Sequence, residues 1–370
     1  MINMKYLILS FIGCFFISFP QSFAQLSPKE SRIITEFSKD LGDDIKKDNL
    51  HGSISAAIIK KGHVIWAGAI GYADMSGDTS ADTGTIYRIA SITKVFTVTI
   101  LMQLVEEEKV RLDDPVENYV PEVKSIQGYP KNTKITLRQL ASHTSGLNRE
   151  PDLPGSSLGP PDQWENIVLS SIPQTSFNGS PGGQFLYSNI GFALLGLALE
   201  RASGVSYIQM VQQRIFTPLN MNNSFFAVPE DKRYRLAQGI DNNKEGAIDT
   251  ILPLRQVEGM GYRVPNGGIW STPSDLAKFA IAFMGGYPLL KPKSIREMLV
   301  IPPGGKNYGL GMMIRRDRQM TLIGHNGSDP GYKSQLAIEP ISGDAVILMR
   351  NYNVGKTNLE ETARDLLERL

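Results

Sequence analysis

A serine and a lysine lie three positions apart in RIASITKVFTVTI, residues 88 to 100. Residues at this spacing occupy one face of a helix, so the side chains of Ser91 and Lys94 would lie side by side. A lysine amine can accept a serine hydroxyl proton when burial or a nearby cation lowers its pKa enough to leave a neutral fraction. The pair therefore has the composition of a nucleophile and its base.

This pairing requires a helix from Ser91 to Glu108. The apolar positions cover nearly the whole helical circumference, which indicates a helix buried on most sides: Ile92, Val95, Phe96, Val98, Ile100, Leu101, Leu104 and Val105. The β-branched run also fits a strand, but its length and acidic end favour a helix. The backbone N–H of Ser91 would then be free to face an oxyanion. Alternatively, Ser91 only caps the helix and Lys94 extends to solvent.

Two further short motifs follow along the chain. YSN, residues 187 to 189, precedes a helical pattern, and HNG, residues 325 to 327, closes a predicted strand. In an extended segment Tyr187 and Asn189 point the same way, so both can reach one cleft. If the fold places Tyr187 beside Lys94, the lysine cation would lower the pKa of Tyr187, which could then share a proton with Lys94. Asn189 could hold Lys94 or donate to a substrate carbonyl.

Together the three motifs resemble those of the serine β-lactamase and penicillin-binding-protein-like hydrolases, whose first motif is Ser-x-x-Lys. YSN is similar to the Tyr-x-Asn form of the second motif, and HNG to the His-x-Gly form of the third. LASHTSGL, LDDPVENYVPE and NGGIWSTPSDLAKF also resemble the family, so the resemblance covers about residues 53 to 350. It implies an acyl-enzyme mechanism with Ser91 as the nucleophile and with Lys94 and Tyr187 as proton carriers.

The resemblance also implies substrate contacts at the third motif. Gly327 would let a substrate backbone lie against the strand edge, and the backbone N–H of Ser328 would be a second oxyanion donor. His325 replaces the lysine of most β-lactamases and, because histidine is only partly charged near neutral pH, is a poorer anchor for a substrate carboxylate. Family members with His-x-Gly include D-alanyl-D-alanine carboxypeptidases, D-amino-acid-specific peptidases and esterases. A dedicated β-lactamase is therefore expected less than a D-alanyl-peptide carboxypeptidase or an esterase.

The remaining histidines are not expected to take part in the chemistry. The resemblance places His143, in SHTSG, in a structural turn near the site. The four histidines are scattered, with no His-Glu-x-x-His run and no cysteine pair, so neither a metal nor a cofactor is expected. No segment fits the deacylating glutamate of class A β-lactamases, so water activation would fall to Tyr187 and Lys94 or to the substrate.

Strand patterns occur at both ends of the chain. Residues 53 to 72 contain two apolar runs around Lys61-Gly62, which predicts a β-hairpin. Residues 308 to 327 and 332 to 351 predict three or four more strands, and apolar spacing predicts a helix over 357 to 370.

The middle of the chain combines helical patterns with loops rich in proline and glycine. Helices are predicted over 189 to 204 and 271 to 286, and a surface loop, expected to line a cleft, over 149 to 163. The patterns predict an α+β fold, in which both chain ends form an antiparallel sheet flanked by helices. A mostly helical region is inserted in the sequence between these two ends. The sheet part would cover about 25 to 90 and 265 to 370, and the helical part about 91 to 264.

The first 24 residues have the pattern of a secretory signal peptide: Lys5, an apolar run from Tyr6 to Phe19, Pro20 and a small-x-small site that ends at Ala24. This predicts export to the periplasm or the medium and a mature chain of residues 25 to 370. A retained anchor is disfavoured because the run is shorter than the roughly 20 residues of a membrane span. Lipidation at Cys14 is disfavoured because the apolar segment continues past it.

Charge excludes one class of partner. The chain has 38 lysines and arginines against 37 aspartates and glutamates, a net charge of +1, without a basic stripe. Nucleic-acid binding is therefore not expected. The expected partner is a small molecule or peptide, such as a peptidoglycan peptide, a β-lactam or an ester. The alternative to an enzyme is a protein that binds penicillins or peptidoglycan fragments without turnover.

Overall fold

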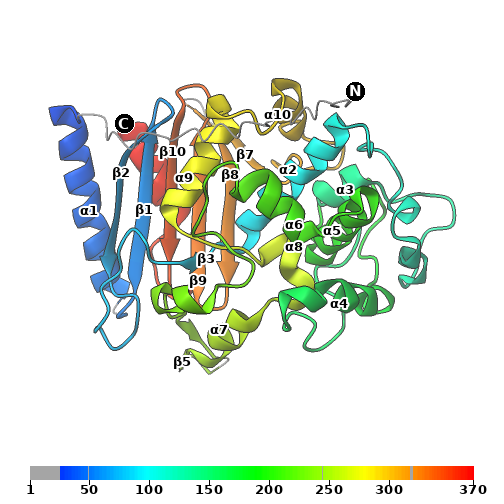
Figure 1. Ribbon diagram of the computed structural model, residues 1–370, viewed down its shortest axis with the longest axis horizontal. Coiled ribbons are helices and arrows are strands. Elements are labelled where there is room, and N and C mark those ends of the chain that lie inside the picture. Colours follow the sequence, from blue (N-terminus) through cyan, green and yellow to red (C-terminus); the bar gives the residue numbers. More distant parts are fainter. Residues whose placement is uncertain (1–25, 49, 244, 317–319) are drawn as a thin grey trace, which may run out of the picture.

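The computed structural model describes residues 26–48, 50–243, 245–316 and 320–370. The predicted signal peptide and Cys14 lie outside these residues. The predicted antiparallel sheet is present, with six strands in the order β2-β1-β10-β9-β8-β7 (Figure 1). The strands are β1 (Ser53–Lys60), β2 (His63–Gly71), β7 (Met313–Arg316), β8 (Thr321–Asp329), β9 (Tyr332–Glu339) and β10 (Asp344–Arg350). The α+β fold predicted from the sequence is confirmed, and where three or four C-terminal strands were predicted the structure has four, β7 to β10.

The two chain ends meet in the centre of this sheet. Strand β1 pairs with β10, so that Ile54 lies opposite Arg350, and with β2 through the predicted hairpin. The hairpin turn is Lys61-Gly62, and both residues have positive φ, 48° and 77°. Two left-handed residues match the right-handed strand twist, and glycine reaches that conformation without strain.

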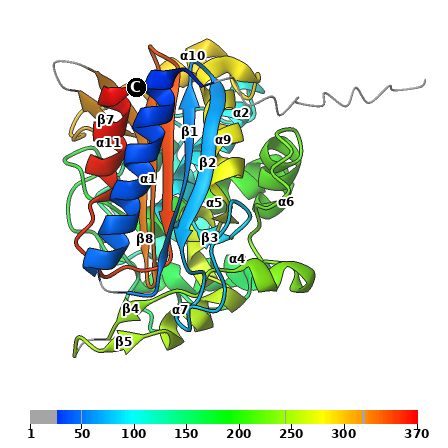
Figure 2. The ribbon, with the colours of Figure 1, turned by 90° about the vertical axis from the view of Figure 1, so that its left-hand side faces the viewer.

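Both faces of the sheet are covered. Figure 2 shows α1 (Pro28–Asp48) and α11 (Leu359–Arg369) side by side across one face. On β1, Ile54, Ala56 and Ile58 pack in this outer core, whereas Ala57 and Ile59 belong to the inner core on the other face. Successive side chains of a strand alternate between faces, so burial of both faces explains the uninterrupted apolar run.

The inner face packs against α9 (Pro273–Ile281) and the helical region at the right of Figure 1. That region contains α2 (Thr93–Glu106), α3 (Leu137–Ala141), α4 (Trp164–Ser171), α5 (Asn189–Ser203), α6 (Tyr207–Val211), α7 (Ile251–Arg255) and α8 (Val264–Gly267), and α10 (Pro292–Met298) follows α9. Two small sheets complete the fold, β3 (Tyr87–Arg88) with β6 (Trp270–Ser271) and β4 (Asp241–Asn242) with β5 (Ile248–Asp249). Across the described ranges, no helix is long and apolar enough to cross a membrane.

The helices that position the predicted motifs begin close to where the sequence places them. Helix α5 starts at Asn189 because the Ser188 hydroxyl accepts the Gly191 N–H at 2.9 Å, and it ends before Gly204, which has φ 69°. In α2 every residue from Thr93 to Met102 is buried, which confirms a helix enclosed on most sides. Its regular turns start at Thr93, so Ser91 lies in the preceding 3₁₀ turn.

Candidate active site

Ser91 sits in a tight turn between β3 and α2. The 3₁₀ turn covers Ala90–Ile92, and the buried Ala90 has φ 47°, a left-handed conformation that costs a non-glycine residue about 1–3 kcal/mol. The Ser334 hydroxyl on β9 donates to the Ile89 carbonyl at 2.8 Å. The sheet therefore holds the turn from below and fixes the backbone on either side of Ser91.

The first and second motifs meet at the Ser91 hydroxyl. Ser91 Oγ lies 3.1 Å from Lys94 Nζ and accepts a hydrogen bond from the Tyr187 hydroxyl at 2.8 Å. Asn189 also reaches this centre, because its Oδ1 lies 2.9 Å from Lys94 Nζ. The structure thus brings together Ser91, Lys94, Tyr187 and Asn189, as the sequence predicts.

Lys94 is fully buried and has the surroundings of a neutral amine. Burial, reinforced by the positive charge of Arg263, lowers the pKa of Lys94 well below its usual range. Its Nζ contacts Ser91 Oγ, Asn189 Oδ1 and, at 3.0 Å, the Asn266 carbonyl. A neutral amine has two hydrogens and one lone pair, so it can donate to Asn189 and Asn266 and accept from the Ser91 hydroxyl. This is the arrangement that a general base requires.

The pKa of Tyr187 differs from the expectation drawn from the sequence. Burial raises the pKa of Tyr187 to about 12, whereas the proximity of Lys94 was expected to lower it. The cause is that burial penalises the phenolate more than the hydrogen bond with Ser91 and the charges of Arg149 and Arg263 favour it. Tyr187 is therefore a phenol that donates to Ser91, and its chemical role is that of a proton donor.

Replacing Tyr187 with phenylalanine tests this role. The substitution removes only the hydroxyl that donates to Ser91 Oγ and keeps the packed ring. We expect kcat for an acyl substrate to fall about 10²-fold, the lower end of the contribution of a positioned acid, with an unchanged Tm. A steady-state assay with thermal unfolding of the same samples measures both. An unchanged kcat would exclude Tyr187 from proton transfer.

His143 supports the second motif from below. Its ring stacks on that of Tyr187 with centroids 4.1 Å apart, and its Nδ1 accepts the Ser188 N–H at 3.0 Å. The residue is buried with φ 59°, so it occupies a tight turn. Its position, beneath Tyr187, agrees with the structural place that the resemblance implies.

The third motif lies on an open stretch of sheet edge. Strand β7 pairs with β8 only from Thr321 to Gly324, so His325 to Asp329 extend past its end, where no described strand pairs with that side of β8. His325 itself faces inward: it is buried, and its ring nitrogens contact the Tyr308 hydroxyl at 3.0 Å and the Asn326 carbonyl at 2.5 Å. Burial lowers the pKa of His325 to about 3. It is therefore neutral and enclosed, which differs from the partly charged side chain expected from the sequence, and its contact with a substrate stays a prediction.

Gly327 has an internal reason to be glycine. A Cβ at this position would lie 2.2 Å from the Ile89 carbonyl oxygen, so its absence lets the turn that carries Ser91 pack on β8. The substrate contact expected of Gly327 stays a prediction. The side chain of Ser328, the next residue, is exposed and lies 3.2 Å from Asn353 Oδ1, and the oxyanion role of its backbone N–H also stays a prediction.

Gly327→Ala should therefore damage both stability and the site. We expect the free energy of unfolding to fall by about 1–3 kcal/mol, the usual cost of overpacking, and hydrolysis to fall because the Ser91 turn must move. Chemical denaturation measures the first effect and an activity assay the second.

Gly42→Ala, in α1, is the matched control. A Cβ at Gly42 would meet Ile70 alone, at an ordinary contact distance of 3.8 Å. This substitution should be neutral or stabilising by up to about 1 kcal/mol. Equal stability of the Gly327→Ala variant and the wild type would show that the Ser91 turn can move to accept the new methyl group with no loss in the free energy of unfolding.

Sequence reasoning missed several residues that complete the site. Asn266 contributes its main-chain carbonyl to Lys94 and donates from Nδ2 to the Asn189 carbonyl at 3.1 Å. Glu150 accepts a hydrogen bond from Asn189 Nδ2 at 2.6 Å, and Arg263 pairs with Asp329 at 2.8 Å. A main-chain contact leaves no side-chain signature in a sequence, and Glu150 stands in a loop segment without a recognisable motif.

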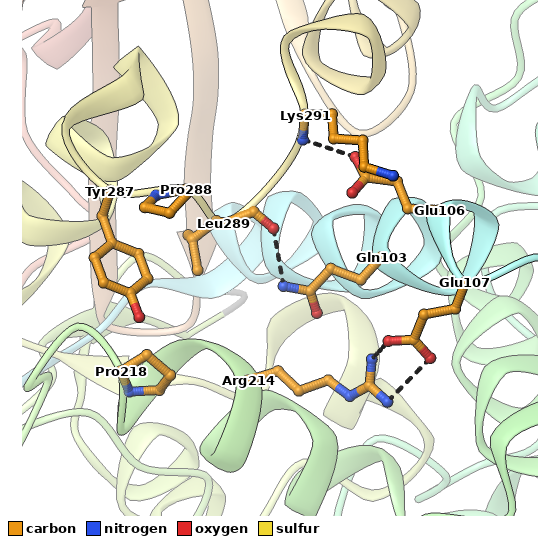
Figure 3. Close-up of a pocket in the computed structure, with 9 residues that line it drawn as sticks. All are labelled: Gln103, Glu106, Glu107, Arg214, Pro218, Tyr287, Pro288, Leu289 and Lys291. Carbon is orange, nitrogen blue, oxygen red and sulfur yellow. Dashed lines mark hydrogen bonds and ion pairs between the residues drawn. The ribbon is translucent and has the colours of Figure 1, made fainter. Parts of the chain in front are cut away.

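A separate cavity of about 510 Å³ lies at the opposite end of α2 (Figure 3). Its polar groups are largely paired with one another: Arg214 with Glu107, Gln103 with the Leu289 carbonyl, and Glu106 with the Lys291 N–H. It contains none of the residues around Ser91. The convergence of Lys94 and Tyr187 on one hydroxyl, and not cavity size, therefore locates the candidate active site.

Comparisons with known proteins agree with this geometry. A model of the beta-lactamase family matches residues 40–370. The chain is 31% identical over 314 residues to Beta-lactamase-like protein 2 of Dictyostelium discoideum, a match that covers 81% of this chain and 56% of the relative. The chain thus spans just over half the length of this curated relative.

Solved structures are similar over nearly the whole chain. The octameric penicillin-binding protein homologue from Pyrococcus abyssi is 28% identical with a TM-score of 0.76, and the match covers 90% of this chain and 76% of that one. The D-amino acid amidase from Ochrobactrum anthropi SV3, complexed with D-phenylalanine, is 25% identical with a TM-score of 0.76 and covers 91% and 98%. With a family model that matches most of its length, this chain belongs to the beta-lactamase family.

Proposed function

We propose that the protein is a serine hydrolase that cleaves amide, lactam or ester bonds through an acyl-enzyme on Ser91. The observation that carries the proposal is the double contact of Ser91 Oγ, with a buried amine whose pKa is lowered by burial on one side and a protonated phenol on the other. The pair supplies a base and an acid at the same oxygen, as acyl transfer requires.

In the first step, Ser91 Oγ attacks the substrate carbonyl carbon while its proton moves to Lys94 Nζ. The new C–O bond gives a tetrahedral intermediate whose oxyanion would be held by the backbone N–H groups of Ser91 and Ser328, as the family resemblance implies. When the bond to the leaving group breaks, Tyr187 gives its hydroxyl proton to the departing nitrogen or oxygen. The Lys94 ammonium then returns a proton to Tyr187, which leaves both residues neutral.

In the second step, water attacks the acyl-enzyme carbonyl. One proton of the water passes through Lys94 or Tyr187 to Ser91 Oγ, and the acid is released. Both residues lie within 3.1 Å of Ser91 Oγ, so no additional base is needed to balance the protons.

The surroundings of the third motif favour some substrates over others. His325 is buried and neutral, so the site has no cation at that position for a free carboxylate on the leaving group. We therefore rank esters and amides with uncharged leaving groups ahead of D-alanyl peptides, and dedicated β-lactam turnover last. The likeness to a D-amino acid amidase supports amides as substrates.

We also propose that the protein is exported to the periplasm or the medium. The signal-like pattern of the first 24 residues supports this. Mass analysis of the protein recovered from each cell fraction tests it: an exported chain that starts at Gln25 supports cleavage after Ala24, and full-length protein in the cytoplasm contradicts it.

Intact-mass measurement over time tests the hydrolase proposal. The protein is mixed separately with a fluorophosphonate and with a penicillin, and peptide mapping locates any adduct. A Ser91 adduct with the fluorophosphonate, and a penicillin adduct that forms and decays, would support a hydrolase with turnover. A penicillin adduct that never decays would support the alternative, a binding protein without turnover. No adduct with either reagent would exclude a reactive Ser91.

A further inference from the structure

Glu150 is tied by hydrogen bonds beside the centre described above. The segment that carries it is tied to the start of α5, where the Asn189 N–H donates to the Arg149 carbonyl at 2.8 Å and the Ser188 hydroxyl to the Asn148 carbonyl at 2.8 Å. Its carboxylate accepts hydrogen bonds from Asn189 Nδ2 at 2.6 Å and from the Tyr262 hydroxyl. Although the side chain is 45% exposed, both carboxylate oxygens face the site.

These contacts complete a chain of hydrogen bonds from Glu150 to the nucleophile. Glu150 bonds to Asn189, whose Oδ1 lies 2.9 Å from Lys94 Nζ, which in turn lies 3.1 Å from Ser91 Oγ. An ionised carboxylate can only accept hydrogen bonds. Glu150 therefore requires the nitrogen of the Asn189 amide on its own side and leaves the oxygen towards Lys94.

The orientation of that amide decides whether Lys94 can act as a base. With Oδ1 towards it, the neutral amine donates to Asn189 and keeps its lone pair for Ser91. With the amide turned over, Nδ2 would donate into the same lone pair and compete with the Ser91 hydroxyl. An asparagine amide has nearly the same shape in both orientations, so only its hydrogen-bond partners choose between them.

Glu150 also affects Lys94 through its charge. After burial, which lowers the pKa of Lys94 most, Arg263 and Arg149 lower it further, and Glu150 and Asp329 raise it. Arg263 and Asp329 form a close pair, so their effects oppose each other. The other groups that face Lys94 are Tyr187, His143 and His325, and the two histidines are neutral at pH 7 because burial lowers their pKa. Arg149 and Glu150, whose charged groups lie 3.5 Å apart, thus have opposite effects on the pKa of Lys94.

We propose that Glu150 is a positioning residue for the Ser91–Lys94 pair: its carboxylate holds the Asn189 amide with Oδ1 towards Lys94 and keeps the lysine lone pair free for the serine. The inference rests on the proposed hydrolase function. Glu150 makes two contributions. Its hydrogen bond to Asn189 sets the reactivity of Ser91, and its charge sets the pH at which Lys94 becomes neutral.

Three variants separate these contributions. Glu150→Leu removes both, and Asn189 can then turn over. Glu150→Gln removes the charge but can still accept from Asn189 Nδ2 through its own oxygen, while its nitrogen donates to Tyr262. Arg149→Gln removes the neighbouring cation, whose side chain lies over the Tyr187 ring at 4.9 Å. The rate of fluorophosphonate labelling of Ser91 is measured against pH for each, because this reaction needs the same proton transfer and releases fluoride.

We expect Glu150→Leu to label about tenfold more slowly on the high-pH plateau, the effect of losing a hydrogen bond to a charged group, and Glu150→Gln to label within about threefold of the wild type. The acid limb of the Glu150→Gln profile should move to lower pH, because the pKa of Lys94 falls without the anion. The limb of Arg149→Gln should move to higher pH. A wild-type plateau for Glu150→Leu, or limbs of the two glutamine variants that do not move in opposite directions, would overturn the inference.

NMR of protein labelled with ¹³C at lysine Cε distinguishes this failure from failure of the hydrolase proposal. The Lys94 resonance is the one missing from Lys94→Met, and its titration needs no reaction at Ser91. If the wild type takes no label, the hydrolase proposal fails, and the NMR titrations still decide the inference. A Lys94 pKa lowered in Glu150→Gln and raised in Arg149→Gln supports it, and titrations identical to wild type contradict it.

Discussion

Replacing Ser91 with alanine is expected to abolish covalent labelling and to lower hydrolysis on the order of 10⁴-fold or more. Without the nucleophile, only substrate binding and oxyanion contacts can still contribute to catalysis. A loss of that size is therefore expected. The fold should tolerate the change, because Ser91 lies in a turn held by backbone packing and its hydroxyl, among the described residues, bonds to Lys94 and Tyr187 alone.

Intact mass and steady-state kinetics on the purified variant measure the two effects. Ser170→Ala is the matched control, since Ser170 is an exposed serine of α4 whose hydroxyl bonds to the Asn166 carbonyl within its own helix. That variant should label as fast as the wild type. Undiminished hydrolysis by Ser91→Ala would move the chemistry to another residue.

Lys94→Met should come close to the same loss, about 10⁴-fold, the upper range for a general base. Methionine fills a similar volume in the buried site, but its thioether sulfur is only a weak acceptor and cannot take the proton of the Ser91 hydroxyl. Lys94→Arg is the informative partner, because a guanidinium stays protonated and cannot act as a base. Single-turnover acylation rates of both variants measure the step in which the proton moves.

If both Lys94 variants are inactive, the amine acts as a base. If Lys94→Arg keeps activity, positive charge is what the site needs, and the proposed proton transfer is wrong. The wild-type pH profile gives an independent check. The pKa of Lys94 is depressed by burial, and only the neutral amine is active, so kcat/KM should be constant at high pH and fall as the pH drops through that pKa.

The sequence was informative where a residue's own chemistry or a local pattern decides its structure. The Lys61-Gly62 hairpin, the helix predicted over 189 to 204 and the buried α2 follow from turn residues and hydrophobic periodicity. The resemblance of the three motifs to those of a known family also implied that Ser91, Lys94, Tyr187 and Asn189 are neighbours in space.

What escaped prediction depends on packing between distant segments. The charge states of Tyr187 and His325 differ from expectation because the folded chain encloses them, and Tyr308 and the strand around His325 are brought together only by the tertiary fold. Asn266 acts through its carbonyl, and any residue type could supply such an oxygen. Glu150 meets Asn189 through the packing of its loop against the start of α5, which joins residues 39 positions apart in the sequence.

The pairing of β1 with β10 also has a consequence for folding. The Ser53 N–H bonds to the side chain of Asn351, 298 residues further along the chain. Closing a loop of that length is entropically costly and makes folding slow, whereas α2, α5 and α8, which pack against one another, all lie between residues 93 and 267. During synthesis the helical region can therefore begin to pack while the central sheet waits for its last strands. Because the Ser91 turn rests on Gly327 and Ser334, the nucleophile acquires its final geometry only after those late strands arrive, and a growing chain would remain inactive until then.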